Sequence, residues 1–226
     1  MVHLHKQGFG GCLADDMGLG KTLQTLTLLQ YIYKPSAPKQ PATLIVVPTS
    51  LLHNWRREAK RFTGLSMMEY NNTVAIDKKR PEKFFGHFHL IFTTYGMMRN
   101  NIDILSSYHF EYVVLDESQN IKNSESLTFR SAIQLQSKHR LALTGTPIEN
   151  SLKGPVGSIS FLYNRTYWAR KSAFQKQFIM PIRQGNERVR VQLQQLTAPF
   201  ILRRSKKRGS SGIPELTEEN NLLRHD

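Results

Sequence analysis

The sequence predicts an α/β fold in which a parallel β-sheet is covered by helices on both faces. Short apolar runs alternate with helical segments over residues 1–150. Runs such as TLIVVP (43–48) and YVVLDE (112–117) are rich in apolar, β-branched residues until they reach a proline or a carboxylate. Continuous rather than alternating apolar runs are typical of parallel strands that are buried on both faces. Ligands bind at the carboxyl ends of such strands.

Six strands and three helices are expected within residues 1–150. The strands are expected at residues 11–15, 43–48, 66–70, 89–95, 112–117 and 140–146. The helices are expected at residues 21–33, 50–62 and 124–135, where apolar residues recur at helical spacing. Ser50 is the candidate N-cap of the second helix. The buried faces of the first two helices are expected to contain Leu23, Leu26, Leu28 or Leu29, Ile32, Leu51, Leu52, Trp55, Ala59 and Phe62.

The periodic pattern weakens after residue 150. Gly154, Pro155 and Gly157 interrupt one helical segment, so residues 151–202 are expected to form a helical or irregular extension of the same lobe. The segment RRSKKRGSSG (203–212) is basic and then flexible, which predicts a basic linker over residues 203–226. Its positive side chains either contact phosphates, brace one lobe of the protein against another or remain solvated as a linker.

The charge of the chain favours a polyanionic partner. The chain carries 31 Lys and Arg against 17 Asp and Glu, and residues 151–226 hold 14 of these basic residues against 5 acidic ones. Nucleic acid is the first candidate and an anionic membrane surface the second. A surface that merely keeps the protein soluble explains the same charge.

The location is expected to be cytoplasmic, including the bacterial nucleoid, or nuclear in a eukaryote. Cys12 is the single cysteine, so no intrachain disulfide forms and a reducing compartment fits. Its apolar surroundings predict a small buried side chain. No apolar run reaches the ~18 residues of a membrane span, and the first residues do not resemble a secretory signal. We therefore expect no membrane partner.

The stretch DDMGLGKTLQT (15–25) places a glycine-rich turn between an expected strand and an expected helix. Such a turn points backbone N–H groups at phosphate oxygens. Lys21 can reach the β- and γ-phosphates of ATP, and Thr22 offers a hydroxyl to Mg²⁺. Asp15 stands where the general GxxxxGK[ST] pattern has its first glycine, so GKT alone is a weak signal. The nucleotide-binding candidates are Asp16, Met17, Gly18, Leu19, Gly20, Lys21 and Thr22.

Two carboxylates follow the most apolar expected strand. Asp116 is placed to hold Mg²⁺, and Glu117 is the candidate base that orients and deprotonates the attacking water. With Lys21 they form the predicted catalytic set. Acidic pairs also end strands without any catalytic role, so this assignment depends on the glycine-rich turn.

A third polar segment, LTGTPIENS (143–151), follows another expected strand. Thr144 and Thr146 offer hydroxyls, and Gly145 permits a tight backbone. Such a segment can sense the γ-phosphate and relay its presence to a nucleic-acid groove. An ordinary turn from strand to helix fits the same residues.

Six segments, in this order, resemble those of superfamily 2 helicase-like ATPases, and among them the Swi/Snf-type DNA translocases. The segments are DDMGLGKTLQT (15–25), LIVVPTSLLHNW (44–55), TTY (93–95), DESQNIKN (116–123), LTGTPIENSL (143–152) and FILRRSKK (200–207). In that family an acidic residue also stands at the position of Asp15. The resemblance implies a RecA-like P-loop NTPase lobe that binds ATP and Mg²⁺ and acts on double-stranded DNA.

The resemblance also implies roles for single residues. Gly18, Gly20, Lys21 and Thr22 would hold the phosphates and the metal, and Asp116 and Glu117 would handle Mg²⁺ and water. Hydroxyls and backbone N–H groups grip phosphates without reading bases; the implied DNA-strand contacts are Pro48, Thr49, Ser50, Thr93, Thr94 and Thr144. Trp55 could stack on a base, but its helical spacing favours a core position.

The chain departs from the family pattern in three places. The family's glutamine-bearing segment for adenine lies well upstream of the nucleotide loop, and Gln7 is too close to it. A long Trp-containing helix is replaced by KGPVGSISFLYNR. We also expect the second RecA-like lobe, with the arginines that reach the γ-phosphate, to be absent from this chain. That lobe is therefore an expected partner, and hydrolysis by this chain alone is expected to be negligible.

Two other classes of function remain open on the sequence. One is a non-catalytic, nucleotide-dependent or purely basic module that binds nucleic acid or protein. The other is an unrelated phosphate-loop enzyme such as a small-molecule kinase, which would need neither TTY nor LTGTPIEN. For a translocase, transcription, chromatin or nucleoid proteins are further candidate partners.

Overall fold

A seven-stranded parallel sheet forms the centre of the protein. The computed structural model describes residues 1–34, 40–71, 76–77, 79–123, 125–145, 161–162 and 175–205. The strand order is β3-β4-β2-β5-β6-β1-β7, and every pairing is parallel. The strands are β1 (Gly11–Leu13), β2 (Thr43–Val47), β3 (Met67–Glu69), β4 (Leu90–Thr94), β5 (His109–Leu115), β6 (Gln136–Leu143) and β7 (Ile201–Leu202). The predicted α/β class and parallel sheet are confirmed.

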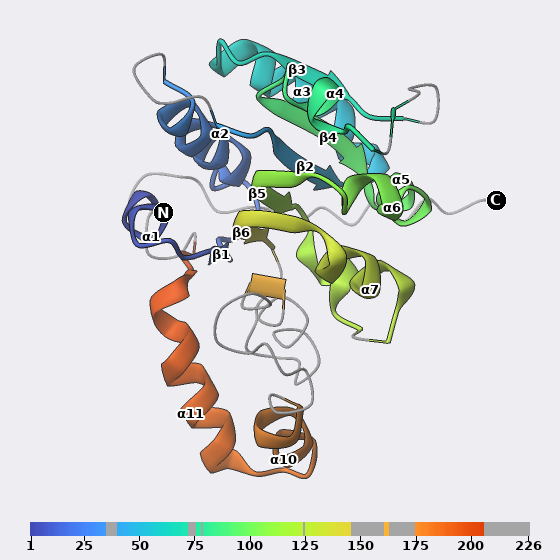
Figure 1. The fold of residues 1–226 in the computed structure, drawn as a ribbon. Coiled ribbons are helices and arrows are strands. Elements are labelled where there is room, and N and C mark those ends of the chain that lie inside the picture. Colours follow the sequence, from blue (N-terminus) through green and yellow to red (C-terminus); the bar gives the residue numbers. More distant parts are fainter. Residues whose placement is uncertain are drawn as a thin grey trace, which may run out of the picture.

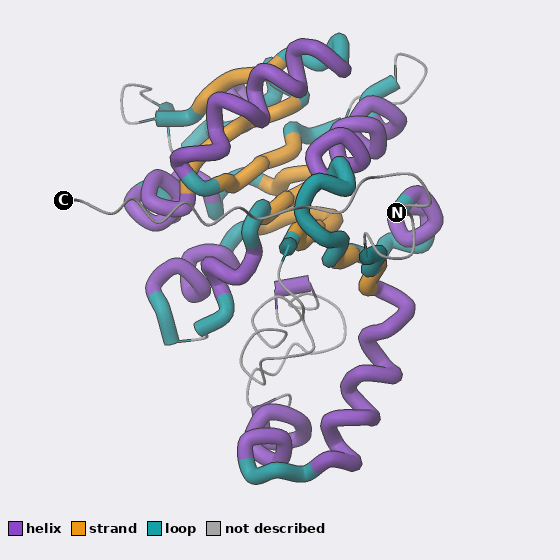
Figure 2. Tube along the Cα trace, turned by 180° about the vertical axis from the view of Figure 1, so that it is seen from behind, coloured by secondary structure: helices purple, strands orange, loops and turns teal. Residues whose placement is uncertain are grey.

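Helices cover both faces of this sheet (Figures 1 and 2). On one face, α2 (Lys21–Ile32) and α3 (Thr49–Phe62) pack with the strands around Leu26, Trp55 and Val114. A second core lies on the other face. Its helices are α4 (Glu82–Phe85), α5 (Tyr95–Asn100), α6 (Ile102–Leu105) and α7 (Leu127–Gln134). Because β2 and β5 lie inside the sheet, all five residues of β2 are buried.

Several details of the helices differ from the sequence prediction. Leu23 is 42% exposed and Phe62 is 45% exposed, so neither belongs to the core. Helix α2 instead buries Thr25, whose hydroxyl bonds to the Lys21 carbonyl. Ser50 is not an N-cap, because α3 begins at Thr49, directly after Pro48, with no side-chain cap. Trp55 is 2% exposed, as its helical spacing predicts.

The last described segment returns to the sheet. It contains η3 (Gln175–Ile179), α10 (Met180–Arg183), α11 (Glu187–Thr197) and η4 (Ala198–Phe200) before β7. Helix α11 extends away from the sheet and leads back to it (Figure 1), and β7 then pairs with β1. Residues 189–204 were expected to be helical or mixed, and the structure has α11 followed by the two-residue strand β7. A strand of two residues is too short to leave a pattern in the sequence. In the part of the chain that the structure describes, no helix is long and apolar enough to cross a membrane.

Candidate nucleotide site at the carboxyl edge of the sheet

The glycine-rich turn lies between β1 and α2, as predicted. Gly18 and Gly20 adopt φ values of 81° and 72°, a region that side chains with a Cβ strongly disfavour. Gly20 is the N-cap residue, and α2 begins at Lys21. The turn therefore presents a helix N-terminus of the kind that binds phosphate.

Lys21 is folded back onto the turn. Its Nζ donates to the carbonyl of Asp15 at 2.7 Å and to that of Asp16 at 3.2 Å. Gly145, which follows β6, lies against the same ammonium, since a Cβ there would be 3.5 Å from Lys21 Nζ and 2.9 Å from Met17 Cγ. Because Gly145 has no side chain, Met17 and Lys21 of the glycine-rich turn can lie close to its backbone. Thr146 and residues 147–151 of that segment lie outside the described residues.

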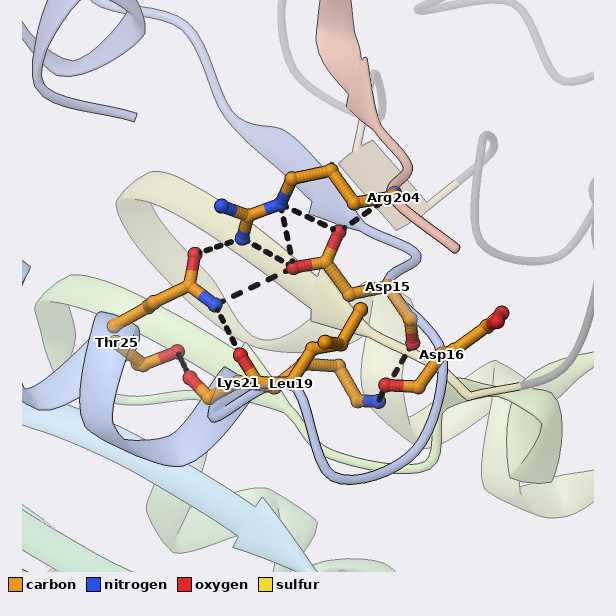
Figure 3. Close-up of polar contacts among 7 residues, drawn as sticks. Asp15, Asp16, Leu19, Lys21, Thr25 and Arg204 are labelled. Atoms are coloured by element: carbon orange, nitrogen blue, oxygen red, sulfur yellow. Dashed lines mark hydrogen bonds and ion pairs between the residues drawn. The ribbon is translucent and has the colours of Figure 1, made fainter. Parts of the chain in front are cut away.

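Asp15 faces away from the turn and binds Arg204 (Figure 3). Its side chain is fully buried. The carboxylate accepts the backbone N–H of Arg204 at 2.9 Å and its guanidinium through Nε and Nη2. Gln24 Nε2 donates to the same carboxylate at 3.3 Å. An acidic residue replaces the usual first glycine here because its side chain anchors the segment that follows β7.

These contacts set the charge state of Asp15. Burial would raise the pKa of its carboxyl, but the hydrogen bonds from Arg204 and Gln24 outweigh burial and lower it. The carboxylate is therefore ionised at neutral pH and forms an ion pair with Arg204. The backbone is tied at the same place, since Asp16 N–H donates to the Arg204 carbonyl at 3.1 Å.

Asp116 follows β5 and is held rigidly. Trp55 Nε1 donates to Asp116 Oδ2 at 2.7 Å, and the backbone N–H of Glu117 donates to Oδ1 at 2.9 Å. The Tyr95 hydroxyl donates to the Asp116 carbonyl at 2.6 Å. Burial raises the pKa of the Asp116 carboxyl despite these donors, and the positive charge of Lys21 lowers it. The sequence predicted Trp55 as a core residue, and the structure shows that its buried indole also donates a hydrogen bond to the Asp116 carboxylate.

Glu117 adopts an unusual backbone conformation. Its φ of 48° is the one positive value for a non-glycine residue in the described part of the chain. Gln119 Nε2 donates to Glu117 Oε2 at 2.6 Å, and Thr144 donates its hydroxyl to Gln119 Oε1 at 3.1 Å. Such strain commonly accompanies functional sites. Gln119 was not among the predicted site residues, although it stands in the recognised segment DESQNIKN.

The sheet brings these groups to one edge. Strand β6 lies between β1 and β5, with Leu13 paired to Leu143 and Leu115 paired to Ala142. The nucleotide turn, the acidic pair and Thr144 therefore all follow the carboxyl ends of three neighbouring strands. Oxygen donors from Thr22 and Asp116 and the ammonium of Lys21 make a donor set that fits a Mg²⁺-bound triphosphate.

The residues expected to contact DNA fall into two groups. Thr49 and Ser50 are exposed at the start of α3, and Thr94 is beside them because β2 and β4 pair through Val47 and Thr94. Thr94 also caps α5 by accepting the Met97 N–H. Pro48 is half-buried between β2 and α3.

The second group is buried. Thr93 has no exposed surface, and its hydroxyl donates to the Tyr70 carbonyl at 3.3 Å. Thr144 is 4% exposed and bonds to Gln119. Neither hydroxyl is available at the surface in this structure. The order of the segments in the sequence could not distinguish the exposed residues from the buried ones. It does not show which residues at the end of a strand are covered by neighbouring elements.

Comparisons with known proteins agree with this arrangement. The family model for the SNF2-related domain matches residues 1–225. The putative ATP-dependent helicase/translocase YwqA of Bacillus subtilis is 36% identical over 99% of this chain, and the match covers 24% of YwqA. Helicase ssl-1 of Caenorhabditis elegans is also 36% identical, over 96% of this chain and 9% of its own length.

A solved structure shows the same fold. The SWI2/SNF2 ATPase core of Sulfolobus solfataricus in complex with dsDNA aligns with a TM-score of 0.77 and 36% identity, covering 91% of this chain and 42% of that one. The chain thus spans less than half of the ATPase core and at most 24% of the two curated relatives. The kinase alternative is removed by these matches. The chain belongs to the SNF2-related family and has the fold of the amino-terminal RecA-like lobe of Snf2-type ATPase cores.

Proposed function

We propose that this chain is the ATP-binding lobe of a DNA-dependent ATPase that translocates on double-stranded DNA. The observation that supports it most directly is the meeting of three polar segments at one edge of the sheet, after β1, β5 and β6. One segment suits phosphates, the second suits a metal ion and water, and the third connects to the second through Gln119.

Each residue has a proposed part in ATP hydrolysis. Lys21 exchanges its two loop carbonyls for phosphate oxygens, and the N–H groups of residues 16–22 surround those oxygens. Thr22 and Asp116 would hold Mg²⁺, which when bound neutralises charge on the β- and γ-phosphates. Glu117, oriented by Gln119, accepts a proton from the attacking water. Trp55 keeps the Asp116 carboxylate aimed at the edge of the sheet.

Thr49, Ser50 and Thr94 are the proposed contacts with a DNA strand. They lie together after β2 and β4, and their hydroxyls and nearby N–H groups suit phosphate oxygens rather than bases. Pro48 fixes the turn that presents them. Thr93 and Thr144 were also expected to contact DNA; their hydroxyls bond inside the protein in this structure, so direct contact with DNA would require these hydroxyls to become exposed.

The second RecA-like lobe is the proposed partner for turnover. An arginine supplied across such an interface contributes about 10³–10⁵ in rate in nucleotide hydrolases generally. Chromatin, transcription or nucleoid proteins are proposed as further partners, in the cytoplasm of a bacterium or the nucleus of a eukaryote.

The test is binding of Mg·ATP by the 226-residue chain, measured by calorimetry. Lys21→Ala should abolish measurable binding, while Lys122→Ala, at an exposed position outside the site, should leave it unchanged. Hydrolysis by the chain alone should stay near background with DNA present, and adding the second lobe should raise it. Unchanged ATP binding by Lys21→Ala would favour the alternative, a non-catalytic basic module that binds nucleic acid or protein.

A further inference from the structure

A cluster of two histidines and one glutamate lies away from the nucleotide site. His5 comes from α1 (Val2–Lys6), Glu111 from β5 and His139 from β6. One ligand atom from each side chain can be chosen so that all three lie within 4.8 Å of one another. Glu111 and His139 occupy the amino-terminal halves of their strands, whereas the nucleotide turn follows the carboxyl end of β1.

The ring nitrogen Nε2 of His139 is the atom of the cluster that most clearly suggests a ligand. The residue is 2% exposed, and its Nδ1 lies 3.2 Å from the Phe9 carbonyl, to which it can only donate. This contact places the proton on Nδ1 and leaves a lone pair on Nε2. Nε2 is buried with no hydrogen-bond partner in the described structure. It lies 3.7 Å from Glu111 Oε1, too far for a hydrogen bond.

Glu111 is a buried carboxyl whose contacts with neighbouring side chains are long. It is 1% exposed, and within the described residues its side chain lies near His139 and near the Lys138 ammonium, which is 3.4 Å away. The Lys138 side chain is 56% exposed, so it can swing into water and release the carboxylate. Burial raises the pKa of Glu111, although the nearby Lys138 ammonium lowers it in part.

His5 completes the set from the solvent side. Its Nδ1 lies 3.2 Å from the Tyr112 hydroxyl. In the tautomer that donates to this hydroxyl, Nε2 keeps a free lone pair. Both histidines then show the arrangement common among metal ligands, in which one ring nitrogen binds the metal and the other donates to an oxygen. Burial lowers the pKa of both imidazoles, that of His139 to about 4, so both are neutral at physiological pH.

We propose that His5, Glu111 and His139 form a binding site for a first-row transition metal ion, with Zn²⁺ as the expected occupant. Two imidazoles and a carboxylate are a common ligand set for zinc, with water in the fourth position. A tetrahedral zinc ion holds its ligand atoms roughly 3.3 Å apart. The Glu111–His139 distance of 3.7 Å is already close to that value, and the His5 ring lies beside that of His139, with 4.6 Å between the ring centroids.

The site would fasten α1 to the sheet. Helix α1 has five residues, none of them buried, and helices this short gain little stability of their own. A metal ion would join it to β5 and β6 at the end of the sheet opposite the nucleotide. Metal binding should therefore raise the stability of the fold without being needed for ATP binding.

The experiment is titration of the metal-free chain with Zn²⁺ and with Co²⁺. One equivalent of Zn²⁺ should raise the melting temperature, and Co²⁺ should give the visible absorption of a tetrahedral nitrogen–oxygen site. His5→Ala and the isosteric Glu111→Gln should each weaken Zn²⁺ affinity at least about tenfold. His3→Ala on the same helix and His53→Ala on α3, both exposed, are the matched controls and should behave as wild type.

Two results would overturn the proposal. One is the absence of any Zn²⁺-dependent change in melting temperature. The other is a change that persists in His5→Ala and Glu111→Gln, or that disappears in the control variants, which would place the ion at exposed surface histidines. Circular dichroism of the metal-free variants checks that they fold, so a lost effect reports on binding.

Discussion

The carboxylate of Asp15 and the guanidinium of Arg204, 189 positions apart in the chain, form an ion pair beside the nucleotide turn. Asp15 is fully buried, whereas the Arg204 side chain is 51% exposed. The pair joins the first residue of the turn to the segment that follows β7. It explains how the turn tolerates an acidic residue in place of glycine, and it gives the described part of the basic segment a structural role.

This pair should stabilise the fold measurably. Asp15→Asn and Arg204→Gln should each lower the free energy of unfolding by about 1–3 kcal/mol, because each leaves a hydrogen-bonded charge without its partner. In the double variant the losses should not add, and a coupling of roughly 0.5–3 kcal/mol is expected. Urea unfolding of the four proteins measures it. Arg130→Gln, at an exposed position on α7, is the control, and fully additive losses would contradict the pairing.

The contribution of Asp15 should depend on pH in the acid range. Its pKa is lower in the folded chain than the ordinary 3.8, so the ionised form is the one that stabilises the fold. That stability is fully present above the ordinary pKa and is lost as pH falls through the lower, folded-state value. The stability difference between wild type and Asp15→Asn should therefore be constant from pH 5 to 7 and shrink below about pH 4. A difference that grows in acid would contradict the sign of the shift.

Removing the Trp55 indole should weaken the binding of Mg²⁺ more than the binding of the nucleotide itself. Trp55→Phe removes the donor to Asp116 Oδ2 while retaining an aromatic ring next to Phe92. The freed carboxylate should hold Mg²⁺ less well, weakening Mg·ATP binding by about tenfold, as is usual when a partner that orients a metal ligand is lost. Binding of ATP without Mg²⁺ should change little.

Tyr95→Phe is the matched control for Trp55→Phe. Tyr95→Phe removes the hydrogen bond to the backbone carbonyl of Asp116 and leaves the Asp116 carboxylate untouched. Calorimetry with and without Mg²⁺ separates the two variants. Equal losses in both conditions for Trp55→Phe would show that the indole acts only through packing.

The sequence predicted the sheet well because each long strand carries its own signal. Residues 43–47 and 112–115 are buried, and burial on both faces of a sheet requires the continuous apolar runs that identify these strands. Strand β7 has two residues, so its position depends on pairing with β1 rather than on local pattern. Leu23 and Phe62 were misplaced because helical spacing shows which residues share a face but not how far the sheet extends beneath it.

The candidate site was predictable only in part for a similar reason. The order of the segments predicted Lys21, Asp116 and Glu117 as site residues, since these residues stand at the ends of recognisable strands or turns. The contacts that orient them come from distant positions: Trp55 is 61 residues from Asp116, and Thr144 is 25 residues from Gln119. A local pattern does not encode which side chains meet across the sheet, and the pairing of Asp15 with Arg204 is of the same kind.

The contacts from Thr144 through Gln119 to Glu117 lead to the last prediction. Gln119 accepts from the Thr144 hydroxyl at 3.1 Å and donates to the Glu117 carboxylate at 2.6 Å, so its amide orientation is fixed from both sides. In a protein that contains both lobes, Thr144→Val and Gln119→Leu should each lower DNA-stimulated hydrolysis, with little change in ATP affinity. A loss of about tenfold or more is expected, because an aligned general base contributes roughly 10²–10⁴.

The two substitutions should also fail to add, because they interrupt one series of hydrogen bonds. The double variant should resemble Gln119→Leu alone. Thr27→Val, which removes an exposed hydroxyl on α2 that bonds only within its own helix, is the control and should keep full turnover. Multiplicative losses in the double variant would mean that Thr144 and Gln119 act independently, and that the segment after β6 does not orient the proposed catalytic carboxylate of Glu117 through Gln119.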